Sequence, residues 1–143
     1  MASRQVQLAG SFNGWTGETI VRTTSGEAWQ QSEYLYHYHY EFMPRAIIDD
    51  TTGQTTMLVS GVPQRVPVMP VSIEVEGVII SDFKGFSVGA LFKFSDGQIW
   101  QQTDSTHSHQ HAHRPEAFIA DGLSGFVLSV EDMEETVSVR RVR

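Results

Sequence analysis

The clearest pattern in this chain is an alternation of residue types with a period of two. It places aromatic residues at every second position of 34–42, namely Tyr34, Tyr36, Tyr38, Tyr40 and Phe42, with Leu35, His37, His39 and Glu41 between them. Successive side chains of a β-strand point to opposite faces, so the pattern predicts a strand with one aromatic face. No segment shows the 3.6-residue apolar period of an amphipathic helix. Short apolar runs between Gly and Pro turns therefore predict an all-β protein.

The alternating segment belongs to a longer stretch that occurs twice, at 29–44 and 100–115. Each copy begins with Trp-Gln-Gln and ends at a proline. The stretch exceeds the usual strand length, so we predict a bend after Trp-Gln-Gln. Trp29 and Trp100 are expected in the core. The glutamines are expected to hydrogen-bond the bend, with a ligand contact as the alternative.

The two stretches are parts of a repeat that covers nearly the whole chain. Trp29 and Trp100 are 71 positions apart, and the same shift aligns 6–72 with 77–143 without a gap. Identities fall on Gly, Pro, Trp and apolar positions, which a backbone turn or a core requires. We therefore predict two tandem SH3-like small β-barrels, 1–70 and 71–143, packed about a pseudo-twofold axis. OB-like barrels and one fused β-sandwich are the alternatives.

The motif also carries a resemblance. Phe-x-Gly-(Trp/Phe), a Gly turn, Trp-Gln-Gln, an alternating Tyr/His strand and a Pro resemble small bacterial SH3-like β-barrel proteins that contain this unit once or twice. The resemblance covers nearly all of each half, and the first copy follows it closely. The second copy departs from it, because His occupies the aromatic positions. No activity is established for such proteins, so the resemblance implies no catalytic residue.

Composition narrows the classes of function. The 143 residues contain no Cys, which excludes disulfides and thiol chemistry and fits a reducing compartment. The net charge of -7 argues against a nucleic-acid partner. The N-terminus lacks a secretory h-region, and no apolar run has the length of a membrane span. We expect a cytoplasmic protein without nucleic-acid or membrane partners, either a monomer with an internal pseudo-dimer or a weak homodimer.

The sequence offers one candidate surface for a partner. The aromatic residues that the pattern exposes or places beside turns are Tyr34, Tyr36, Tyr38, Tyr40, Trp15 and Phe86. Tyrosine suits interfaces because it combines a large area with a hydroxyl and few rotamers. For the tyrosines the alternative is cross-strand packing of the rings within the sheet, and for Trp15 and Phe86 it is that they plug the ends of the barrels. The first hypothesis is therefore a non-enzymatic protein- or peptide-interaction module. No nucleophile motif, phosphate loop or HExxH motif points to an enzyme.

The second hypothesis is divalent metal binding. The 71-residue shift replaces the aromatic face with imidazoles at His107, His109, His111 and His113. Two histidines at i and i+2 of a strand point the same way and are about 7 Å apart, which suits Zn or Ni. Oxygen ligands could come from Asp104, Glu116 or Asp121. A solvent-facing or interface strand without a metal is the alternative. No other cofactor is expected.

Overall fold

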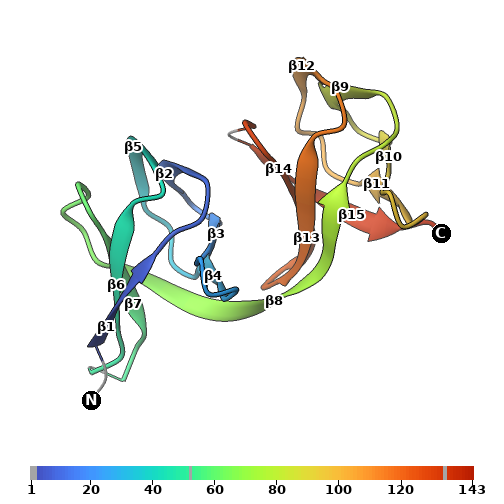
Figure 1. Ribbon diagram of the computed structural model, residues 1–143. Coiled ribbons are helices and arrows are strands. Elements are labelled where there is room, and N and C mark those ends of the chain that lie inside the picture. The colour runs from blue at the N-terminus through green and yellow to red at the C-terminus, as the bar shows by residue number, and fades with distance from the viewer. Residues whose placement is uncertain (1–2, 52, 134) are drawn as a thin grey trace. The chain divides into compact units, whose positions relative to one another are not determined.

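The computed structural model describes residues 3–51, 53–133 and 135–143, and every regular element in these ranges is a β-strand (Figure 1). The all-β prediction is confirmed. The chain divides into two compact units, Met1–Ser72 and Ile73–Arg143. Each unit has its own hydrophobic core. One strand, β8 (Val66–Val78), runs across this division.

Antiparallel strands build the first unit. They are β1 (Ser3–Gln7), β2 (Ser11–Thr16), β3 (Ile20–Arg22), β4 (Ala28–Gln31), β5 (Tyr36–Phe42), β6 (Arg45–Asp49), β7 (Thr56–Val59) and the beginning of β8 (Val66–Val78). The main ladder has the order β1-β6-β7-β8-β4-β3. β2 and β5 form a separate two-stranded sheet.

The second unit has the same arrangement. Its strands are the end of β8, β9 (Phe83–Phe86), β10 (Leu91–Lys93), β11 (Ile99–Gln102), β12 (Ser108–Ala112), β13 (Glu116–Gly122), β14 (Gly125–Val130) and β15 (Thr136–Arg141). The main ladder has the order β8-β13-β14-β15-β11-β10, and β9 pairs with β12 separately. Positions 71 apart share the same register: Gly14 lies opposite Tyr38, and Gly85 lies opposite His109.

The sheets are open, and none closes into the predicted barrel within the described ranges. In each unit the end of the first strand meets the third strand through one isolated bridge, Leu8 with Thr23 and Ile79 with Phe94. The reason lies in β2 and β9, which leave the main ladder to pair with β5 and β12. A single bridge then takes the place of a full strand pair.

A glycine beside a register shift lets β5 lie close against β2. The register shifts between Phe12 and Gly14, and Gly14 has a φ of 97°. A Cβ at Gly14 would collide with the backbone carbonyl of His37 and would lie 2.8 Å from the backbone nitrogen of His39. Gly85 has a φ of 108° and would meet the backbone of Ser108 in the same way. Only glycine permits both the positive φ and this close strand contact.

The predicted bend after Trp-Gln-Gln is present, and a buried glutamine holds it. Gln31 is 2% exposed, and its Oε1 accepts a hydrogen bond from the backbone of Gly17 at 2.9 Å. Its Nε2 donates to the carbonyls of Glu33 and Leu35 at 3.0 and 2.8 Å. One side chain thus satisfies three backbone groups of two loops and sets the direction in which β5 begins.

Gln102 has the same role in the second unit. Its Oε1 accepts from the backbone of Ser87 at 2.9 Å, and its Nε2 donates to the carbonyl of Thr106 at 2.7 Å. The loop carboxylate of Asp104 accepts from the same Nε2 at 3.0 Å and from the backbone of Ser138 at 2.7 Å. These partners account for the second glutamine of each Trp-Gln-Gln as a loop clamp.

Candidate interaction surface

The aromatic face of β5 is the largest exposed apolar feature on a strand of the first unit. It consists of Tyr36, Tyr38, Tyr40 and Phe42, which are 64%, 61%, 56% and 65% exposed, together with Tyr34 in the loop just before the strand, which is 78% exposed. The alternate residues of β5 are only partly buried. Monomeric proteins rarely expose a contiguous apolar surface of this kind without using it to bind a partner. The aromatic face is therefore the first candidate site.

Two local contacts fix the ends of the aromatic face. The ring of Tyr34 lies over Gly17, where an added Cβ would be 3.1 Å from the ring. The hydroxyl of Tyr40 is 3.5 Å from the hydroxyl of Ser11 on β2. β5 itself is held by its register with β2, in which Trp15 lies opposite His37. The exposed rings thus sit on a strand whose position is set by the core beneath it.

The opposite face of β5 carries charge and imidazoles. His39 Nε2 lies 3.3 Å from Glu41 Oε1, and the two side chains are 26% and 40% exposed. The imidazole of His39 also lies against Gly61, where a Cβ would come within 2.6 Å of the ring. This face therefore contacts the loop after β7, while the aromatic face is directed away from the core.

Trp15 and Phe86 do not belong to this surface, which corrects the sequence analysis. They are 0% and 1% exposed and lie in the cores of their units. Trp15 packs edge-on against Phe12 with ring centroids 5.3 Å apart, and Phe86 packs against Phe83 at 5.8 Å. The sequence suggested turns around Gly14 and Gly85. The glycines instead lie inside strands, beside the register shifts with β5 and β12, and the neighbouring aromatic residues point inward.

The two Trp-Gln-Gln tryptophans differ in burial. Trp100 is buried, and its Nε1 donates to Gln98 Oε1 at 3.0 Å. Trp29 is partly buried and packs against the core of its unit. Both positions therefore support the core and not the candidate surface.

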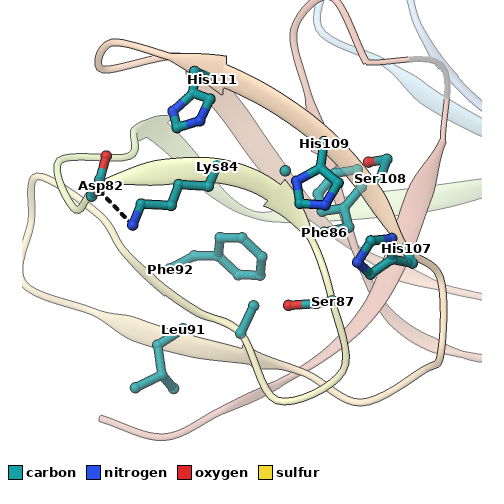
Figure 2. Close-up of a pocket in the computed structure, with 12 residues that line it drawn as sticks. Asp82, Lys84, Phe86, Ser87, Leu91, Phe92, His107, Ser108, His109 and His111 are labelled. Atoms are coloured by element: carbon teal, nitrogen blue, oxygen red, sulfur yellow. Dashed lines mark ion pairs between the residues drawn. The ribbon is translucent and has the colours of Figure 1, made fainter.

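The second unit has a hollow where the first has its aromatic face. The hollow measures about 510 Å³, and its lining includes Phe86, Phe92, Lys84, His107, His109 and His111. Figure 2 shows His107 and His109 close together at one end, and His111 farther along the strand. The rings of His107 and His109 are 4.9 Å apart and nearly perpendicular. Lys84 lies 3.4 Å from Asp82, so the hollow combines an apolar floor with a polar rim.

The predicted metal ligands gather only in part. His107 and His109 are adjacent, and His109 and His111 are exposed on β12. In the described ranges, no group of three or more His, Asp or Glu side chains is placed to hold a metal ion. Asp104, one predicted oxygen ligand, is engaged by Gln102 and Ser138. Asp82 and Lys84 were not predicted, because a short charged turn gives no sequence signal for a hollow.

The carboxyl group of Asp49 has a clearly shifted pKa, and it lies away from both surfaces. The hydroxyl and backbone N–H of Thr51 hydrogen-bond to Asp49, and Arg65 lies 3.6 Å away. These contacts lower the pKa of Asp49. Asp49 ends β6, and this arrangement is a turn cap, not a catalytic carboxylate held in a shielded site.

Comparison with known proteins identifies no relative that would indicate the role of either surface. The chain matches no protein-family model, no curated protein and no solved structure. Among the described residues there is no helix with the length and apolar character needed to cross a membrane.

Proposed function

We propose that the chain is a non-enzymatic interaction module that binds a protein or peptide through the aromatic face of β5. One observation carries the proposal: four aromatic side chains at alternate positions of β5, and Tyr34 in the loop just before it, are each more than half exposed. Such rings lose little conformational entropy when they are covered, and each hydroxyl can still hydrogen-bond at the edge of a contact. The acidic charge and the absence of a phosphate-binding motif favour a protein partner over a nucleic acid.

We also propose that the chain is a duplicated SH3-like unit, related to the small bacterial proteins that share its Trp-Gln-Gln motif. The shared strand order and register at a spacing of 71 positions support this origin. Packing of the units about a pseudo-twofold axis stays a prediction, as does a cytoplasmic location. In a duplicated chain, one copy can keep an ancestral surface while the other changes. The aromatic face and the imidazole hollow are then two versions of one site.

The test of the interaction surface uses the second unit as a matched control. Peptides are first selected from a random library for binding to the whole wild-type chain. Their affinity is then measured for the wild type and for two variants. One is Tyr36→Ser/Tyr38→Ser/Tyr40→Ser, and the other is the equivalent triple of the second unit, His107→Ser/His109→Ser/His111→Ser. Each buried interface tyrosine contributes on the order of 1–2 kcal/mol, so the tyrosine variant should lose affinity by about 100-fold or more. The histidine variant should bind as the wild type does. Selected peptides that bind the tyrosine variant within about threefold of wild type would contradict the proposal.

Metal binding through the His107–His113 strand is the second candidate function. The contact between the rings of His107 and His109 favours it, since two adjacent imidazoles would supply two of the four ligands of a tetrahedral Zn site. Titration calorimetry with Zn²⁺ and Ni²⁺ should show binding by the wild type that His107→Ala/His109→Ala abolishes. Substitution of His37 and His39 by Ala serves as the control and should leave the heat unchanged. Absence of heat for wild-type protein at about 50 µM would remove this candidate.

A further inference from the structure

The aromatic face borders a strand edge that is open in the described part of the chain. β5 pairs with β2, and the structure records no second strand beside it. The His37 carbonyl and the His39 nitrogen lie on the β2 side, against Gly14. Further along, Met43 N–H donates to the Gly10 carbonyl at 2.8 Å. His37, His39 and Met43 occupy every second position on both sides of the register shift between Tyr38 and Glu41, so we infer that the backbone groups of Tyr36, Tyr38 and Tyr40 are directed to the open edge.

When two copies of β5 are aligned antiparallel, the residues that face each other across the pair are complementary. Around His39 as a centre, Tyr38 pairs with Tyr40, and Tyr36 pairs with Phe42. The remaining pair is His37 with Glu41, an imidazole opposite a carboxylate. Aromatic pairs and oppositely charged pairs are the cross-strand combinations that stabilise an antiparallel sheet. A strand with this property fits its own copy without a change of sequence.

We propose that β5 pairs antiparallel with β5 of a second copy of this chain, with His39 on the twofold axis. The inference rests on the proposed function, because it names the partner of the same strand. In this pairing, the outward backbone groups of Tyr38 in one copy form hydrogen bonds with those of Tyr40 of the partner subunit. His39 then forms the central non-hydrogen-bonded pair, where the two Cα atoms approach to about 4.5 Å. Addition of a strand at an open edge is a common mode of recognition.

The other face of the pair provides charge complementarity. Glu41 Oε1 is already 3.3 Å from His39, which leaves Oε2 for His37 of the partner subunit. His37 is partly buried and shares this face with Glu41, so the antiparallel pairing brings its imidazole opposite the partner's Glu41. The twofold axis produces this contact twice. In a parallel pairing Glu41 would face Glu41, so charge selects the antiparallel orientation.

A single cysteine tests the geometry, since the chain has none of its own. In His39→Cys the two thiols meet on the axis, within the Cα distance that a disulfide requires. Under mild oxidation this variant should convert for the most part to a covalent dimer. Gln110→Cys, the equivalent position of β12, is the control and should remain largely monomeric. If His39→Cys cross-links no faster than the control, the proposed pairing is wrong.

Charge exchange tests the contact without a covalent bond. Sedimentation from about 1 µM to about 1 mM should show wild-type protein approaching twice its 16.0 kDa chain mass. His37→Glu places two carboxylates opposite each other, and Glu41→Lys places an ammonium opposite an imidazole. Each variant should therefore sediment as a monomer, and an equimolar mixture should regain the dimer, since every carboxylate then faces a cation. A mixture that stays monomeric would overturn the inference.

The outcomes separate this inference from the broader function. A wild-type chain that stays monomeric throughout, while its selected peptides bind the aromatic face, removes self-pairing and keeps the interaction module. The opposite result is a dimer that the mixed charge variants regain, together with peptides whose binding does not depend on the tyrosines. That result supports self-pairing and removes the peptide-binding function. Variants that each dimerise as the wild type does would place any dimer contact elsewhere and would also overturn the inference.

Discussion

Gly14→Ala is expected to unfold the first unit under conditions in which the wild-type chain is stable. The new Cβ would collide with the carbonyl of His37, and Gly14 already has a φ of 97°, which side chains rarely adopt. The strained φ alone costs about 1–3 kcal/mol, and separation of β2 from β5 adds to this cost. The free energy of unfolding should therefore fall by about 4 kcal/mol. Urea denaturation of the whole chain, followed by tryptophan fluorescence, measures this loss.

Gly26→Ala is the matched control. Gly26 has a φ of 94°, but a Cβ there would meet nothing within 4 Å. The substitution should therefore cost only the strain of the turn, about 1 kcal/mol. Equal losses in the two variants would show that the bulge contact at Gly14 does not hold β5 in place.

Gln102→Ala should give the second large effect. It removes a 1% exposed side chain that bonds to the backbone of Ser87 and Thr106 and to the carboxylate of Asp104. Each backbone group left without a partner costs about 1–3 kcal/mol, so the free energy of unfolding should fall by about 3 kcal/mol or more. The same urea experiment measures it.

Gln101→Ala provides the comparison on the adjacent residue. Gln101 points to the other face of β11, where it donates to the carbonyl of Gly89 and accepts from the guanidinium of Arg140, both in exposed surroundings. Its loss should cost less than about 1 kcal/mol. If both glutamine variants lose the same stability, the loop clamp is not what holds the bend before β12.

Local patterns predicted the strand content because a period of two depends only on side-chain direction. That direction is why the sequence could place Tyr36, Tyr38, Tyr40 and Phe42 on one face, and the structure exposes them together. The bend after Trp-Gln-Gln was also predictable, since the stretch was too long for one strand. The sequence could not show that Gln31 clamps the bend, because its partners Gly17, Glu33 and Leu35 are backbone groups of two loops.

The errors come from long-range pairing. Trp15 and Phe86 flank glycines that resemble turn residues, and only the pairing with β5 and β12 shows that those glycines lie inside strands whose aromatic residues point inward. The closed barrel failed for a related reason: β2 and β9 pair outside the main ladder, which local sequence does not reveal. The hollow beside His107 depends on Phe92 and Lys84, which come from separate strands.

The most direct test of the central claim is to map the binding surface by amide chemical shifts. The whole chain, labelled with ¹⁵N, is titrated with a peptide selected on it, and the shift of each backbone amide is followed. The account predicts the largest changes at 34–42 on and beside β5, with smaller changes on β2 and none beyond error at 107–113. Changes centred on 107–113, or spread over both cores without a maximum on β5, would contradict it.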